Sequence, residues 1–392
     1  FKSNSGGDSE AIKAIIDKMT LEQKVAQLFV VSPETLTGVD SVQYAGDMTY
    51  QALQDYPVGG IVFAKDNIDS SSQFGTMTDN LQSYSEEISG LPLFLAAAEE
   101  GGSASVLGNN DNLDEYYENS YSDDGSDYSS SSANSVHSGA PSMSEIGRKD
   151  DSTNAYEAGK SIGSLMSAYG LNLDLAPVAD VLSGNSTGIG NRTFGTDAQT
   201  VSDMALEVIR GIQEEDVNAA MKYFPGYGAA SSNMSGFPVI NCSLDELKKK
   251  EFLPYSNAIA QGMDFVMVGH ISVPNVTGDD TPASLSEKMI SEVLRKDLGF
   301  KGIVMTDYLN DKTIVKNYGA ADAAVKAIQA GADLLLEPDD LEAAYEGVLK
   351  AVKKGDITED RLDESIYRIL RVKLSMQDES SDTTESESVS DY

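Results

Sequence analysis

The feature that most constrains the fold is an alternation of short, β-rich apolar runs with longer segments of helical periodicity. This alternation is typical of βα units arranged around a parallel sheet. Eight units in 392 residues predict a single-domain α/β fold, a (β/α)8 barrel of the TIM type, rather than an open doubly wound sheet. The eight candidate strands are Gln27–Val31, Gly60–Phe63, Leu93–Ala97, Leu173–Ala176, Asn218–Met221, Phe265–Val268, Gly302–Thr306 and Asp333–Leu336.

Helical patterns separate the strands. They cover about 71–87, 155–169, 197–214, 244–261, 285–297, 318–330 and 340–354. Ser-x-x-Glu sequences at Ser243 and Ser284 predict capping boxes at two of the N-termini. A last helix, from Glu359 to about Met376, is expected to pack on the outside of the barrel.

Composition divides the chain into one ordered domain and three polar segments. The domain is expected over residues 10–376, after a polar tether at 1–9. An acidic, Ser/Tyr-rich insertion at 109–135 and an acidic tail at 377–392 contain no Lys or Arg and few apolar residues. Because such segments bury too little apolar surface to offset the entropy of ordering, we expect a mobile insertion and a disordered tail. Solvation is the expected role of both, with partner binding as the alternative.

The charge and the rare residue types exclude several functions. Lys and Arg number 28 against 63 Asp and Glu, and the formal charge of -35 repels nucleic acid and anionic membranes. The single cysteine, Cys242, rules out an intramolecular disulfide, and two histidines, His137 and His270, disfavour a histidine metal centre. No nucleotide-binding glycine motif or nucleophile elbow is present. We therefore expect no metal or cofactor, and chemistry based on carboxylates.

The start of the chain bears on localisation. No run of 18 apolar residues exists, so no membrane span is expected. The polar residues 1–9 fit a tether that follows a removed signal or lipid anchor, or equally a trimmed end. An extracellular or cell-surface location is expected, and a cytoplasmic one remains open.

Functional groups of a (β/α)8 barrel lie at the C-terminal ends of its strands. The polar residues that follow the predicted strands are Glu99, Glu100, Asp180, Asn191, Arg192, Lys222, Tyr223, His270, Asp307 and Glu337. Asp307, directly after Gly-Ile-Val-Met-Thr, is a candidate nucleophile or stabiliser of a sugar cation; the alternative is a helix N-cap. Arg192 and Lys222 are candidates for substrate binding or for a structural ion pair.

Two further residues join the substrate-binding candidates by position alone. His270 follows a buried strand and is either a ligand or proton shuttle or a hydrogen-bonded structural histidine. Glu99 follows the third strand and faces the same end of the predicted barrel.

A series of motifs over residues 10–376 resembles one known family. The motifs are Met19–Leu28, Pro57–Phe63, Glu99–Gly102, Leu173–Val181, Asn191–Gly195, Lys222–Gly228 and Gly302–Asp307. Their order is similar to that of the N-terminal domain of glycoside hydrolase family 3, and most similar to its single-domain β-N-acetylhexosaminidases, which act on peptidoglycan amino sugars. The resemblance implies that Asp307 is the nucleophile of a retaining mechanism and that Arg192 and Lys222 bind the sugar.

The sequence departs from the family where the acid/base group is expected. Tyr223 and Tyr227 replace the two histidines of Lys-His-Phe-Pro-Gly-His-Gly, and Ala229 replaces the aspartate that follows. Asn233-Met234-Ser235 stands where the family has Asp-Ser-His, whose His and Asp form the acid/base dyad. Ala98 replaces the sugar-binding aspartate before the two glutamates, and the arginine after the glycines is missing.

Loss of a general acid/base typically costs 10²- to 10⁴-fold in rate. We therefore predict an impaired or non-catalytic relative, a pseudoenzyme whose barrel mouth binds a β-linked glycan, a peptidoglycan fragment or a protein partner. The alternative is an active retaining β-glycosidase that uses Asp307 with a substitute acid/base, supplied by Glu99, Glu100, Tyr227 or the insertion.

Overall fold

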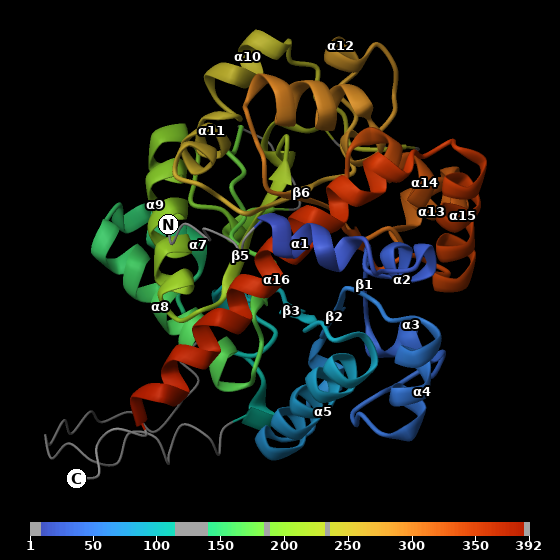
Figure 1. Ribbon diagram of the computed structural model, residues 1–392. Coiled ribbons are helices and arrows are strands. Elements are labelled where there is room, and N and C mark those ends of the chain that lie inside the picture. Colours follow the sequence, from blue (N-terminus) through green and yellow to red (C-terminus); the bar gives the residue numbers. More distant parts are fainter. Residues whose placement is uncertain (1–8, 114–139, 184–188, 232–235, 388–392) are drawn as a thin grey trace, which may run out of the picture.

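The computed structural model describes residues 9–113, 140–183, 189–231 and 236–387, and side chains as far as residue 376. Most of the predicted tether, most of the insertion at 109–135 and the end of the acidic tail lie outside the described residues. The described residues form one barrel of parallel strands surrounded by helices (Figure 1).

Eight strands form the barrel, as predicted from the sequence. Every paired neighbour is parallel, in the order β7-β6-β5-β4-β3-β2-β1-β8. A parallel bridge between Met305 and Leu334 joins β7 to β8 and closes the ring. The strands are β1 Phe29–Val31, β2 Gly60–Val62, β3 Phe94–Ala97, β4 Leu173–Asp174, β5 Asn218–Phe224, β6 Phe265–Val268, β7 Ile303–Thr306 and β8 Leu335–Leu336.

Helices connect the strands and cover the outside of the barrel. The α-helices are α1 Ser9–Ile16, α2 Leu21–Ala26, α3 Pro33–Thr37, α4 Asp47–Asp55, α5 Ser71–Ser89, α7 Met143–Lys149, α8 Ser152–Ala168, α9 Ala198–Glu214, α10 Leu244–Lys249, α11 Leu253–Ala260, α12 Pro274–Thr277, α13 Lys312–Asn317, α14 Ala320–Ala330, α15 Leu341–Lys354 and α16 Glu359–Glu387. A π-helix, η7, covers Lys288–Asp297. Short 3-10 helices are η1 Lys65–Asn67, η2 Gly102–Ala104, η3 Asp111–Leu113, η4 Gly190–Arg192, η5 Tyr227–Ala229 and η6 Ala283–Leu285.

Two predicted helix ends differ from the structure. The capping box at Ser243 is present, but the one at Ser284 is not, because the Ser284 hydroxyl bonds to the imidazole of His270 instead. Helix α16 continues to Glu387, into the segment predicted as a disordered tail. Extending an existing helix avoids the cost of nucleation, which explains how a polar sequence stays helical there.

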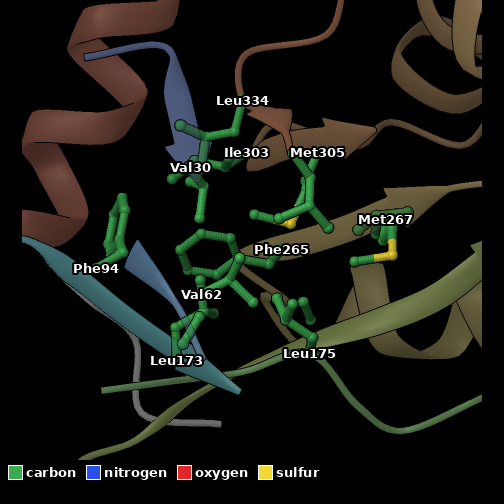
Figure 2. Packing of buried hydrophobic residues seen from close by; sticks show 14 of the residues in the cluster. Val30, Val62, Phe94, Leu173, Leu175, Phe265, Met267, Ile303, Met305 and Leu334 are labelled. Carbon is green, nitrogen blue, oxygen red and sulfur yellow. The ribbon is translucent and has the colours of Figure 1, made fainter. Parts of the chain in front are cut away.

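The interior of the barrel is filled by apolar side chains from most of its strands. Figure 2 shows side chains of β1, β2, β3, β4, β6 and β7 converging on the centre, with Phe265 in the middle of the group. Phe94 and Phe265 meet edge to face, with ring centroids 5.5 Å apart. The barrel is therefore a packed core rather than a pore, and polar chemistry is restricted to its ends.

Helix α16 crosses the N-terminal ends of the strands, beside α1 (Figure 1). Its side chains contact residues just before β1, β6 and β8, namely Gln27, Asp264 and Asp333. The opposite, C-terminal end of the barrel is left for the functional loops.

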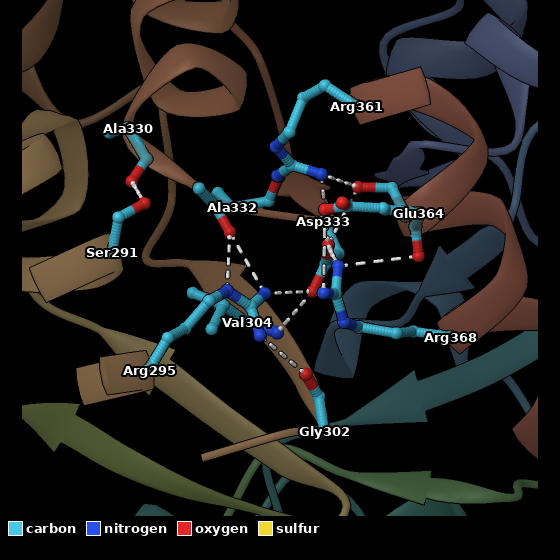
Figure 3. Close-up of polar contacts among 12 residues, drawn as sticks. Ser291, Arg295, Gly302, Val304, Ala330, Ala332, Asp333, Arg361, Glu364 and Arg368 are labelled. Atoms are coloured by element: carbon cyan, nitrogen blue, oxygen red, sulfur yellow. Dashed lines mark hydrogen bonds and ion pairs between the residues drawn. The ribbon is translucent and has the colours of Figure 1, made fainter. Parts of the chain in front are cut away.

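A buried carboxylate, Asp333, holds α16 and η7 to the barrel (Figure 3). Its oxygens lie 2.5 Å from Arg295 of η7, 3.0 Å from Arg368 and 3.6 Å from Arg361, both of α16. Burial acts to raise the pKa of Asp333, but the three guanidinium groups hold it below its ordinary value. The cluster is thus an ionised carboxylate shared by three cations.

Lys373 of α16 is a buried cation with a different environment. Its ammonium donates a 2.8 Å hydrogen bond to Gln27 Oε1 and lies 5.1 Å from the centroid of the Phe94 ring. Burial lowers the pKa of Lys373 to about 7.

Replacing Asp333 by Ala is expected to reduce the free energy of unfolding by about 3–5 kcal/mol, because three partly buried guanidinium groups lose the buried carboxylate that they share. Urea denaturation measures the loss. The control is Asp297→Ala, which breaks an exposed pair with Lys248 and is expected to change stability little. Equal losses in the two variants would contradict a structural role for the cluster.

Lys373→Met is expected to change the pH dependence of stability. Because the pKa of Lys373 is about 7 folded and about 10.4 unfolded, folding releases a proton between these values. Stability of the native chain therefore rises with pH across this window, by about 1.4 kcal/mol per pH unit relative to the variant. Unfolding curves of both proteins at pH 7, 8.5 and 10 measure the slope. Lys301→Met, a change at an exposed lysine, should keep the pH dependence of the native chain, and parallel curves for the native chain and Lys373→Met would refute the assignment.

Candidate active site

Two consecutive glutamates follow β3, and their side chains have different roles. The Glu99 carboxylate accepts hydrogen bonds from the backbone N–H groups of Val106, Leu107 and Gly108 at 2.8 to 3.1 Å. It is buried, and burial raises its pKa. Glu99 therefore holds the loop after β3 in place.

Glu100 binds the two cations of the site. Its Oε1 lies 2.5 Å from Lys222 Nζ and 2.7 Å from Arg192 Nη2, and its Oε2 lies 2.6 Å from Arg192 Nε. Burial acts to raise the pKa of Glu100, but Lys222 and Arg192 keep it below its ordinary value. One ionised carboxylate thus fixes the positions of both candidate sugar-binding residues.

Arg192, at the end of η4, reaches across the mouth from β4 to β5. Its Nη2 also donates to the Tyr223 hydroxyl at 2.6 Å, and its guanidinium lies 5.5 Å from the centroid of that ring. Among the described residues, no hydrogen-bond partner of Arg192 Nη1 is found, and 29% of the side chain is exposed. This edge of the guanidinium is available to a hydroxyl of a bound molecule.

Asp307 directly follows β7, where the sequence placed it. Its Oδ1 accepts the Tyr308 N–H at 2.9 Å, and its Oδ2 accepts the Tyr227 hydroxyl at 3.3 Å. The next helix, α13, is capped by Asp311. Asp307 is therefore held at the barrel mouth and is not the N-cap of that helix.

The two tyrosines after β5 pack against each other. The rings of Tyr223 and Tyr227 meet edge to face, with centroids 5.2 Å apart. Burial raises the pKa of both phenols, that of Tyr227 well above its ordinary value. Both hydroxyls consequently remain protonated near neutral pH.

His270 is buried after β6, and both ring nitrogens have partners. Nδ1 lies 2.7 Å from the Ser284 hydroxyl, and Nε2 lies 2.8 Å from the Tyr308 carbonyl oxygen. These contacts tie the ends of β6 and β7 together. Both ring nitrogens are thus occupied by groups of the protein itself.

Two buried aspartates complete the site, and sequence reasoning did not single out their environment. Burial raises the pKa of Asp174 well above its ordinary value and that of Asp180 to about 7. Asp174 Oδ2 and Asp180 Oδ1 have no hydrogen-bond partner among the described residues. Asp174 ends β4 next to Glu99, whose N–H it accepts at 2.9 Å. The only signal for it was an acidic residue at the end of a buried strand.

The structure thus brings together Asp307, Arg192 and Lys222, linked through Tyr223, Tyr227 and Glu100. Ala98, at the end of β3, is partly buried. Asn233 and Ser235 lie outside the described residues. Within the described ranges, no group of three metal-ligating side chains and no helix able to span a membrane is found.

Comparison with known proteins gives a consistent picture. Residues 131–372 match the model described as the glycosyl hydrolase family 3 N terminal domain. The chain is 28% identical over 359 residues to the beta-hexosaminidase LpqI of Mycobacterium tuberculosis, covering 89% of this chain and 82% of that protein.

Solved structures agree with the sequence relatives. A glycoside hydrolase family 3 beta-N-acetylglucosaminidase from Paenibacillus superposes with a TM-score of 0.79 at 32% identity, over 92% of this chain and 63% of that one. A family 3 glycosyl hydrolase from Mycobacterium smegmatis gives 0.74 at 29% identity, over 91% and 98%.

Glu100→Gln is expected to reduce the free energy of unfolding by about 3–5 kcal/mol, because it leaves Lys222 buried without a carboxylate. Thermal and urea unfolding measure the effect. The matched control is Glu22→Gln, which affects an exposed ion pair with Lys353 and is expected to change stability little. A Glu100→Gln protein as stable as the native chain would show that another group neutralises the two cations.

Proposed function

Because the chain belongs to glycosyl hydrolase family 3, we propose that it binds a β-linked amino-sugar glycan at the barrel mouth as an impaired retaining glycosidase with Asp307 as its nucleophile. The amino-sugar class is proposed from the relatives, which carry the names beta-hexosaminidase and beta-N-acetylglucosaminidase. The impairment is proposed from the groups around Asp307.

The position of Asp307 is the observation that carries the proposal. A retaining glycosidase needs one carboxylate that attacks the anomeric carbon and a second group that protonates the leaving oxygen. Asp307 lies at the end of β7 with each oxygen oriented by one donor, and none of its described contacts is an ion pair. Such a carboxylate is oriented without a described cation bound to it, which suits a nucleophile.

Glu99, Glu100 and Tyr227, the described residues named as substitutes, are poorly suited to the second task. Glu99 is turned into its own loop, and Glu100 is occupied by Lys222 and Arg192. The Tyr227 hydroxyl is bonded to the nucleophile itself, and its raised pKa makes it a weak acid. General acids work best when their pKa lies near the operating pH. These contacts favour impaired hydrolysis over an active enzyme with one of these residues as a substitute acid/base.

Sugar contact is proposed for Arg192. Among the described residues its Nη1 has no partner, whereas Lys222 is 3% exposed and its Nζ lies 2.5 Å from Glu100. The role proposed for Lys222 is therefore to hold Glu100, and through it Arg192, in place. Glu99 and His270 are proposed to stabilise their loops rather than to touch the glycan.

The test is intact-protein mass spectrometry after incubation with 5-fluoro-β-N-acetylglucosaminyl fluoride, because fluoride leaves without strong acid assistance. We expect a mass increase that maps to Asp307 and is absent in Asp307→Asn. The control is Asp311→Asn, which makes the same change at an exposed helix cap four positions along the chain.

Leaving-group dependence distinguishes the impaired enzyme from an efficient one. An aryl N-acetylglucosaminide should be cleaved at least 10²-fold faster than an alkyl one, since only the alkyl oxygen needs protonation. Comparable cleavage of both would support the active alternative. Absence of any adduct, combined with saturable binding of chitobiose by calorimetry, would make the chain a glycan-binding protein without a nucleophile.

A further inference from the structure

The hydroxyl of Tyr227 lies between the backbone of β6 and the carboxylate of Asp307. It accepts the N–H of His270 at 3.0 Å and lies 3.3 Å from Asp307 Oδ2. A phenol has a single proton, and the His270 N–H can only donate. The Tyr227 proton therefore points to Asp307, and the direction of the hydrogen bond is settled by the geometry.

The position of Tyr227 is fixed independently of Asp307. Its backbone N–H donates to Asp180 Oδ2 at 3.0 Å, and its ring packs on the edge of Tyr223. Gly226, which precedes it, has φ 115°, a conformation that favours glycine. Gly228, which follows it, packs so closely that a Cβ there would lie 2.2 Å from the Val181 carbonyl oxygen. The hydroxyl is thus a rigid donor and not a side chain that adapts to the carboxylate.

We propose that Tyr227 is a positioning residue that fixes the carboxylate of Asp307 and shortens the lifetime of a glycosyl ester on it. This role rests on the proposed function of Asp307 as nucleophile. In the first step the Asp307 oxygen bonds to the anomeric carbon while the bond to the leaving group breaks, and the bonding electrons go with the leaving group. In the second step a water oxygen bonds to that carbon, the electron pair of the ester bond returns to Asp307, and a proton of the water passes to solvent.

The effect on lifetime follows from the change in charge at Asp307. Hydrogen bonds to a charged acceptor are roughly twice as strong as those to a neutral one. The Tyr227 hydroxyl therefore stabilises the free carboxylate more than the ester. As the ester bond breaks and negative charge returns to Asp307, the hydrogen bond strengthens and lowers the barrier to release.

Tyr227→Phe tests the role by removing only the hydroxyl. After labelling with 5-fluoro-β-N-acetylglucosaminyl fluoride and removal of excess reagent, we expect the Asp307 adduct of the variant to persist about tenfold longer than that of the native chain. The reagent concentration for half-maximal labelling should change less than twofold, since the hydroxyl contacts the nucleophile and not the sugar. A purely structural disturbance would instead alter the concentration dependence.

The matched control is Tyr255→Phe. Tyr255 is fully buried against Phe224, and among the described residues its hydroxyl has no hydrogen-bond partner. This variant loses the same atom outside the contacts of Asp307 and should keep the native adduct lifetime. Equal lifetimes in all three proteins would overturn the role of Tyr227 while leaving the nucleophile assignment intact.

A second measurement keeps the inference testable if the native chain forms no adduct, an outcome that would remove the proposed function. Melting temperatures of Tyr227→Phe, Asp307→Ala and the double variant form a double-mutant cycle. We expect the double variant to lose less than the sum of the two single losses. Additive losses would show that the two side chains are not coupled and would overturn the positioning role itself.

Discussion

The parallel pairing of eight strands, closed between β7 and β8, is the constraint on which the rest of the structure depends. Parallel pairing sends every strand end of one kind to one end of the barrel. The bridge of Met305 to Leu334 completes the ring and places Asp307, after β7, on the same face as the residues that follow β3, β4 and β5. The N-terminal face receives α16 and the buried Asp333 cluster. Stability and candidate chemistry are thereby separated to opposite ends of one core.

At the mouth, the balance of charge decides which groups can act. Glu99, Glu100, Asp174 and Asp180 are all buried there, and the two cations, Lys222 and Arg192, both contact Glu100. Glu100 takes both cations, and burial raises the pKa of each of the other three carboxyls. Burial thus opposes ionisation of these three carboxyls, whereas the charge of Glu100 is neutralised by Lys222 and Arg192.

The sequence was sufficient for the barrel and insufficient for the site contacts. Strand positions could be predicted from apolar periodicity, because short β-rich apolar runs between helical segments are typical of buried strands. The contacts of single side chains could not be predicted in the same way. A serine hydroxyl can cap a helix or form a hydrogen bond with a ring far along the chain, and only the fold brings His270 to 2.7 Å from the Ser284 hydroxyl. Glu99 and Glu100 are adjacent and chemically identical, yet one holds a loop and the other holds two cations. The different roles of the two glutamates depend on which residues surround each side chain in the fold, and the sequence around them does not indicate this.

Tyr223 and Tyr227, where the resemblance to the family led us to expect histidines, form an ordered part of the mouth. An imidazole titrates near neutral pH and can exchange protons with a substrate. Tyr223 and Tyr227 contact Arg192, each other and Asp307, and burial raises the pKa of both phenols. Asp307 is oriented and the Arg192 edge is exposed, while burial disfavours proton loss from the two phenols. On the proposed function, glycan binding needs the exposed Arg192 edge, whereas hydrolysis of an unactivated glycoside needs in addition the oriented Asp307 and a group that exchanges protons.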